Sequence, residues 1–164
     1  EIDFRKAIGS MREVFWPGRL EFLQYKERSV LLDAAHNLEG ARNLALALRD
    51  IYEYRHLTMM VGILGDKDRQ GMIDLLGPFA DRVVVTRPPS PRADDYSQVA
   101  SYFRGYCREV EVVESITAAL ERSVELTAEG DLLCITGSIY MLQEIRGLFG
   151  GAVQSGQESC CCKS

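Results

Sequence analysis

Short apolar runs alternate along the chain with segments in which apolar residues recur every three or four positions. The runs predict strands buried on both faces at residues 30–33, 57–64, 82–86, 110–113 and 131–136. The segments between them predict helices at about 41–51, 69–76, 96–106, 115–126 and 138–149. Residues 20–26 predict one more strand, which a short turn joins to the next, so it should run antiparallel at a sheet edge.

This alternation predicts an α/β fold. We expect a Rossmann-like three-layer domain with a mostly parallel six-stranded sheet, one antiparallel edge strand and helices on both faces. A helical stripe in residues 4–15 ends at Trp16, Pro17 and Gly18, because proline cannot continue a helix. Residues 1–16 are therefore expected to be the end of a preceding domain with its hinge, or else the first helix of this one. Residues 17–150 should form the main domain, and residues 151–164 a disordered tail.

Composition narrows the class of protein. A chain of 164 residues that is 46% hydrophobic predicts one core. The net charge of -5 argues against a nucleic-acid partner, although it leaves room for a local anion site. No apolar stretch reaches the length of a membrane helix and no secretory signal is recognisable, so we expect no membrane partner and a cytoplasmic location.

The five cysteines fall into two groups. Cys107 and Cys134 follow or occupy apolar segments and are expected to be core thiols. Cys160, Cys161 and Cys162 are adjacent in the polar tail, without the two-residue spacing that zinc ligands usually have. Their spacing predicts no function.

Polar side chains follow several predicted strands. Asp33, His36 and Asn37 lie at the first strand-to-helix corner, and Asn37 is also a good helix cap. Because the carboxyl ends of parallel strands share one edge, ligands of such sheets bind there. The loop after the next strand carries Asp66, Lys67 and Asp68, a second loop carries Arg87 and Arg92, and Ser138 precedes a helix whose free N–H groups favour an anion.

Each of these residues also has an ordinary structural explanation. Asp33 can be a turn residue, residues 66–68 a solvated charged loop, Arg87 a surface cation and Ser138 a simple helix cap. His56 has no neighbour that indicates chemistry and is expected at the surface. The placement of all the others at one edge favours a ligand site over these separate explanations.

Five motifs in order support a more specific interpretation: WPGRLEFL, LLDAAHNLEGARNLALAL, GILGDKD, the PRA of RPPSPRA, and ITGSIY. Together they resemble the carboxyl-terminal domain of the folylpolyglutamate synthase and dihydrofolate synthase family, within the Mur ligase superfamily. The resemblance covers residues 16–149. Leu38 departs from it, since the family usually has proline there, and the family does not explain the cysteine-bearing tail.

The resemblance implies an ATP-dependent ligase that adds L-glutamate to a folate or dihydropteroate carboxylate. ATP phosphorylates the carboxylate, the glutamate amine attacks the acyl phosphate, and phosphate leaves. By the same resemblance Arg19 and Asp33 would bind ATP.

Two further residues are assigned by the resemblance, and two more are added on chemical grounds. His36 would organise the reaction centre, and Ser138 would hold or orient the incoming glutamate. Lys67, as a catalytic cation, and Arg92, as a substrate ligand, are less direct additions that meet the need for positive charge beside a carboxylate and a phosphoryl group.

The chain contains no G-x-x-x-x-G-K-[ST] phosphate loop. The resemblance assigns that loop, most Mg²⁺ ligands and the folate pocket to an amino-terminal ATPase domain, so the present chain alone should be inactive, and the enzyme is expected to be a monomer. Two alternatives remain: the domain of another Mur-type amino-acid ligase, or a non-catalytic Rossmann-like nucleotide-binding module. The absence of G-x-G-x-x-G argues against a dinucleotide site.

Overall fold

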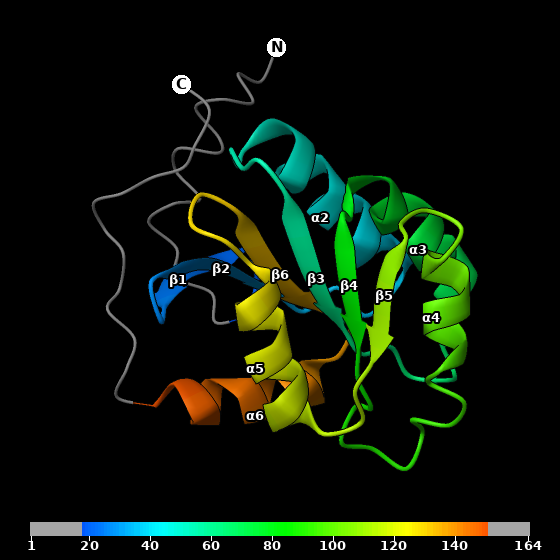
Figure 1. Cartoon of the computed structure of the whole chain (residues 1–164). Helices are drawn as coiled ribbons and strands as arrows, with labels where there is room; N and C mark the ends of the chain where they lie inside the picture. Colours follow the sequence, from blue (N-terminus) through cyan, green and yellow to red (C-terminus); the bar gives the residue numbers. More distant parts are fainter. Residues whose placement is uncertain (1–17, 151–164) are drawn as a thin grey trace.

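Six strands form one sheet in the order β1-β2-β6-β3-β4-β5, within residues 18–150, the part of the chain that the computed structural model describes (Figure 1). The strands are β1 (Glu21–Tyr25), β2 (Arg28–Asp33), β3 (Leu57–Val61), β4 (Arg82–Val85), β5 (Glu109–Val112) and β6 (Leu132–Thr136). β1 pairs with β2 in antiparallel orientation, and the other pairs are parallel. The predicted sheet, including its antiparallel edge strand, is confirmed.

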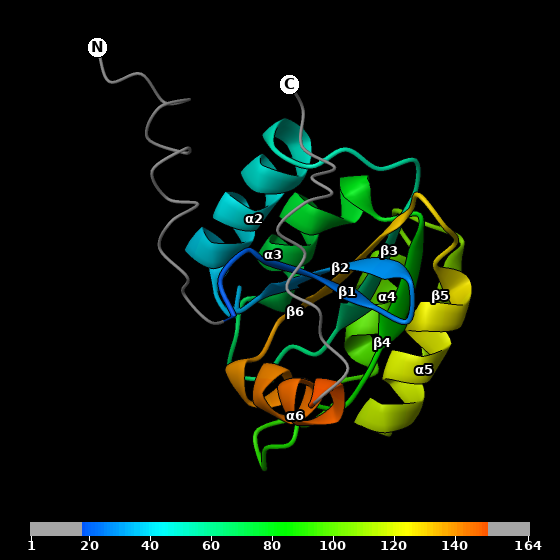
Figure 2. The ribbon, with the colours of Figure 1, turned by 90° about the vertical axis from the view of Figure 1, so that its left-hand side faces the viewer.

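Helices cover both faces of this sheet. They are α2 (Leu38–Asp50), α3 (Arg69–Leu76), α4 (Gln98–Phe103), α5 (Ile116–Leu126) and α6 (Ile139–Phe149), with one 3₁₀ turn, η1 (Gly77–Phe79). Figure 1 shows α5 and α6 in front of the strands and α2 and α3 behind them, and the view from the β1 edge in Figure 2 separates the same two helical layers. The three-layer arrangement is therefore as predicted.

Successive residues of the central strands supply two different cores. Leu31 and Met59 pack with α2, α3 and α4, whereas their neighbours Leu32 and Met60 pack with α5 and α6. Side chains of a strand alternate between faces, so a strand with helices on both sides must be apolar at every position. This is why the runs for β2, β3 and β6 are continuous rather than alternating.

Two boundaries and the burial of one strand differ from the prediction. β3 ends at Val61, because residues 62–64 leave the sheet although they stay buried. α4 begins at Gln98, after turns that occupy residues 94–97. The prediction that every run is buried on both faces is wrong for β5, where Glu109 and Val112 are exposed, because β5 is the last strand of the sheet.

Both predicted core thiols are confirmed. Cys107 and Cys134 are buried and free, and burial raises the pKa of each thiol. The predicted helix at residues 4–15, the hinge at Trp16 and Pro17, and the tail at 151–164 with its three cysteines lie outside the described residues. None of the helices described between residues 18 and 150 has the length and apolar character needed to cross a membrane.

Candidate functional site

The carboxyl ends of the parallel strands are level with one another. The register places Asp33 of β2 beside Thr136 of β6, and Thr136 beside Val61 of β3. The loops that follow these strands therefore leave the sheet at the same edge, which is the lower end of the strands in Figure 1. This edge carries the residues that the sequence proposed as a site.

Asp33 holds the turn that carries Arg19. Its Oδ2 accepts a hydrogen bond from the Leu20 N–H at 3.0 Å, and the Ala34 N–H donates to the Gly18 carbonyl at 2.7 Å. Leu20 has a φ of 46°, a left-handed conformation that is a true outlier for a bulky residue. The two bonds hold this strained turn against the end of β2, with the side chain of Arg19 exposed at the corner.

The charge environment of Asp33 joins it to two other predicted residues. The side chain is only 8% exposed, and this burial raises the pKa of its carboxyl. The N–H groups of Leu20 and Ala35 and the electrostatic interactions with Arg19 and His36 act in the opposite direction without cancelling the effect of burial. Arg19, Asp33 and His36 thus form one electrostatic group.

The ring of His36 is oriented by the backbone. Its Nδ1 lies 2.7 Å from the carbonyl oxygen of Ala34. Because a carbonyl can only accept, Nδ1 must carry the proton, and a neutral imidazole then presents Nε2 as an acceptor. The next side chain, Asn37, is occupied as the cap of α2, since its Oδ1 accepts from the Gly40 N–H at 2.8 Å. The predicted cap is confirmed, and Leu38 in place of proline still begins a regular helix.

Ser138 lies at the start of α6 but does not cap it. The residue is 1% exposed, and its Oγ is a buried atom without a hydrogen-bond partner among the described residues. Buried hydroxyls are normally paired, so an unpaired one at a helix N-terminus, where backbone N–H groups are also free, calls for an explanation. A ligand that accepts hydrogen bonds at this point would provide one.

Sequence reasoning missed Thr136. Its Oγ1 is likewise buried and unpartnered within the described part of the chain, two residues before Ser138 and level with Asp33. A hydroxyl at the last residue of an apolar strand was the available signal, but threonine is so common in strands that it carried little information.

Lys67 and Arg92 come together around a different carboxylate. Asp66 Oδ2 lies 3.5 Å from Lys67 Nζ and 3.0 Å from Arg92 Nη1. Desolvation works against ionisation of Asp66, but the charges of the two cations outweigh it and lower the pKa of this carboxyl. Within residues 18–150 no hydrogen bond or ion pair connects this group to Asp33. The predicted site residues thus form two groups at one edge.

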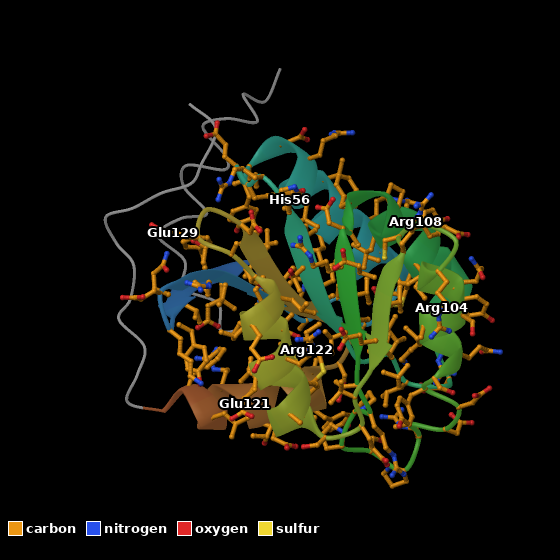
Figure 3. All side chains as sticks on the ribbon, in the orientation of Figure 1. His56, Arg104, Arg108, Glu121, Arg122 and Glu129 are labelled. Carbon is orange, nitrogen blue, oxygen red and sulfur yellow. The ribbon has the colours of Figure 1, made fainter. Side chains whose placement is uncertain are left out.

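Two other predicted residues are at the surface, as expected. Arg87 is exposed and pairs with Glu114 at 3.3 Å. His56 lies at the opposite end of the strands, in the upper part of the molecule in Figure 3, and its Nδ1 is 3.3 Å from Asp131 Oδ1. Neither belongs to the group around Asp33.

Two cavities open near this edge. The smaller, about 210 Å³, lies between the turn at Gly18, the residue Ala34 and the first turns of α6, and so borders the corner directly. The larger, about 580 Å³, lies along the proline-rich loop after β4. None of the six predicted site residues lines either cavity, but Gly18, Ala34 and Ile139 of the smaller one are the sequence neighbours of Arg19, Asp33 and Ser138.

Comparison with known proteins identifies the family. The sequence profile of the family described as "Mur ligase, glutamate ligase domain" matches residues 18–139. The chain belongs to this family. The glutamate ligase domain is also 35% identical over 149 residues to the dihydrofolate synthase/folylpolyglutamate synthase of Mycobacterium tuberculosis, a match that covers 82% of this chain and 30% of that protein.

Solved structures give the same assignment for this glutamate ligase domain. The folylpolyglutamate synthase of M. tuberculosis complexed with ADP superposes with a TM-score of 0.74 at 32% identity, over 94% of this chain and 37% of that one. The folylpolyglutamate synthase of Thermotoga maritima gives 0.73 at 31% identity, over 90% and 34%. The resemblance inferred from the motifs is confirmed, and the chain spans about a third of the length of these relatives.

The part of the glutamate ligase domain between residues 18 and 150 contains no group of three or more His, Cys, Asp or Glu side chains that could hold a metal ion. The residues that are present fit other ligands better. The exposed guanidinium of Arg19 and the N-terminus of α6 suit phosphate or carboxylate oxygens.

Proposed function

We propose that the chain is the C-terminal domain of an ATP-dependent folylpolyglutamate synthase/dihydrofolate synthase, which adds L-glutamate to a folate or dihydropteroate carboxylate. The observation that carries the proposal is the buried, unpartnered hydroxyl of Ser138 beside the Arg19–Asp33–His36 group. The names of most of the relatives, among them a bacterial protein whose structure was solved with ADP, support the substrate class.

The reaction needs phosphoryl transfer followed by acyl transfer. The γ-phosphoryl group of ATP passes to the substrate carboxylate and leaves ADP. The amine of glutamate then attacks the acyl carbon, and the new amide forms as the C–O bond to phosphate breaks and the amine loses a proton. The described residues offer no metal cluster, so Mg²⁺ is proposed to be held mainly by the other domain.

Each residue of the corner has a proposed part in these steps. Arg19 places a positive charge beside the phosphates of the nucleotide, and Asp33 binds ATP as well as fixing the Arg19 turn. His36 presents Nε2 toward the reaction centre, where it can accept a hydrogen bond from the attacking amine. Ser138 orients the incoming glutamate together with the N–H groups that begin α6.

Lys67 and Arg92 supply the remaining positive charge. Both pair with Asp66, so the three side chains together carry one net positive charge. We assign Lys67 to the catalytic group and Arg92 to the carboxylate of glutamate, whose planar shape suits a guanidinium.

The proposed partner of this domain is an amino-terminal ATPase domain of the same protein. Three exposed apolar side chains, Leu38, Ile139 and Tyr140, begin α2 and α6 at the edge that carries the site. Exposed apolar groups around a polar site are expected where another domain covers it. Because the 164 residues contain no phosphate loop, we predict that they do not ligate glutamate alone.

The test uses the full-length protein that contains this chain, incubated with ATP, L-glutamate and either dihydropteroate or tetrahydrofolate. ADP release that depends on glutamate, together with a glutamyl product seen by mass spectrometry, is expected. Ser138→Ala should raise KM for glutamate, whereas Ser101→Ala, a change at an exposed position of α4, should leave the kinetics unchanged. Glutamate ligation by the isolated 164-residue chain, or none by the full-length protein, would contradict the proposal.

A second ligase function is favoured by one relative. The chain is 31% identical over 140 residues to the UDP-N-acetylmuramoyl-L-alanyl-D-glutamate--2,6-diaminopimelate ligase of Prochlorococcus marinus, over 80% of its own length. The same assay with a UDP-linked muramoyl peptide and diaminopimelate separates the two functions. Turnover with that pair and none with the folate substrates would assign the domain to the cell-wall branch.

A further inference from the structure

Arg69 is a buried cation that the proposed chemistry does not use. It is the first residue of α3 and is only 7% exposed. Its guanidinium donates to four main-chain carbonyls, those of Ile63 at 3.3 Å, Leu64 at 3.2 Å, Asp94 at 2.6 Å and Asp95 at 3.1 Å. One side chain therefore joins the loop after β3 to the loop after β4.

The charge of Arg69 is balanced mainly by these carbonyls. The nearest carboxylate oxygen with which it pairs, Asp94 Oδ1, lies 4.0 Å from Nη2 on a side chain that is 79% exposed. An isolated buried charge is costly, so it persists only where hydrogen bonds compensate it. The planar fork of arginine can reach acceptors on two loops at once, which the single ammonium group of lysine cannot.

The two loops are pressed together where Arg69 joins them. The Gly65 N–H donates to the Arg92 carbonyl at 2.9 Å, and the side chain of Asp94 lies against Gly65. Asp95 has a φ of 41°, in the left-handed region that residues other than glycine rarely adopt. Such strain persists where surrounding contacts determine the conformation, and Arg69 bonds to the carbonyl of this residue.

These same loops carry Lys67 and Arg92. Lys67 is two residues from Gly65, Arg92 provides the carbonyl that Gly65 binds, and Asp66 bridges the two cations. We propose that Arg69 is a positioning residue, whose clamp on the two loops holds Arg92 in place for a carboxylate of the amino-acid substrate. The identity of that substrate rests on the proposed function, whereas the clamp itself does not.

The clamp can be tested in the 164-residue chain by hydrogen exchange. In Arg69→Lys the positive charge remains but the fork is lost, so the Gly65 amide should exchange about tenfold faster or more while the amides of β6 keep their protection. The matched control is Arg104→Lys, at a residue whose side chain Figure 3 labels on the outside of the molecule near α4. Equal Gly65 exchange in both variants would overturn the proposal. If Arg69→Lys does not fold, Arg69→Gln serves in its place, judged by the same amide.

The positioning role is tested in the full-length protein by kinetics. Arg69→Lys should raise KM for glutamate about tenfold, with kcat and KM for ATP within about twofold of the parent protein and of Arg104→Lys. Faster Gly65 exchange with an unchanged KM for glutamate would overturn the role, because the clamp would then be structural only. A parent protein without ligase activity would refute the proposed function, and the exchange measurement would still decide whether Arg69 clamps the loops.

Discussion

Replacing Gly137 with alanine should destabilise the domain more than any ordinary surface change. Gly137 lies between β6 and Ser138 and has a φ of 111°, which L side chains rarely adopt. A Cβ at this position would lie 2.6 Å from the Gly62 carbonyl oxygen and 2.9 Å from its carbon. The contact is with backbone, and the Gly62 N–H is itself bonded to the Thr136 carbonyl at 3.1 Å, so Gly62 cannot move away without weakening that bond.

The magnitude follows from two separate costs. Holding a residue other than glycine at such a φ costs about 1–3 kcal/mol, and overpacking against a fixed neighbour costs about 1–3 kcal/mol. The sum, about 2–6 kcal/mol, is a large part of the roughly 5–15 kcal/mol that stabilises a typical domain. With a mid-range urea m-value of about 2 kcal/mol per molar, the unfolding midpoint should fall by about 1–3 M.

The assay is urea unfolding of the 164-residue chain followed by circular dichroism. Gly147→Ala is the matched control, because Gly147 lies within α6 and a Cβ there would meet nothing within 4 Å. That substitution should stabilise the chain by about 0.5–1 kcal/mol, since alanine is the better helix former. A loss below about 1 kcal/mol for Gly137→Ala would show that the turn before Ser138 adapts to a side chain, and would refute the reasoning.

Three further predictions concern single side chains. Burial raises the pKa of Asp33 above its ordinary 3.8, so its contribution to stability is present at low pH and is lost as the pH rises through the folded pKa. Asp33→Asn keeps an oxygen for the Leu20 N–H, and it should gain stability relative to the parent as the pH rises from 3.8 to neutrality. Parallel urea titrations that show no such trend would contradict this. Ser138→Ala should leave the stability of the chain unchanged or raise it by about 1 kcal/mol, because it removes an unpaired buried hydroxyl. The same change should impair glutamate use by the full-length protein. A less stable chain would indicate a missing structural partner instead. Arg122, labelled on α5 in Figure 3, donates two hydrogen bonds to Glu111 at 2.8 and 2.7 Å, and both side chains are 41% exposed. A double-mutant cycle should therefore give a coupling energy of about 0.5–1 kcal/mol that decreases with added salt and as the pH falls through the Glu111 pKa, which the bond from Arg122 lowers. A coupling energy that persists in high salt would contradict the assignment.

The strands and helices could be predicted because the same burial rule acts along the whole chain. A strand covered on both faces must be apolar throughout, as in β3 and β6, and a helix that covers it must be apolar on one side. The rule fails for β5, since nothing in residues 110–113 says that the strand is the last of the sheet. The edge position of β5 follows from the order of the parallel strands, which its own residues do not specify.

The candidate site could be predicted in its residue types and its location but not in its internal contacts. The corner at Asp33 and His36 follows from the rule that strand ends share an edge, and the Asn37 cap follows from local sequence. The bond from the Leu20 N–H to Asp33 spans 13 residues, and the clamp of Arg69 on Asp94 and Asp95 spans about 25. Such contacts depend on how two loops approach each other, and the periodicity of the sequence does not indicate that approach.

Three departures from local rules lie at the carboxyl edge of the sheet, although the opposite end also has two left-handed residues, Lys26 and Glu27, and among the described residues a buried unpartnered hydroxyl, Thr58 Oγ1. Leu20 is left-handed, Ser138 keeps a buried hydroxyl without a partner, and Asp33 is a carboxyl with a pKa raised by burial. Each of these features costs stability, and proteins tolerate such costs mainly where function requires them. The other end of the strands differs: the buried carboxylate of Asp131 is paired with His56 at 3.3 Å and Arg82 at 3.7 Å. A buried charge there is compensated by neighbouring side chains, whereas the hydroxyl of Ser138 at the carboxyl edge has no partner among residues 18–150 and can bind a ligand.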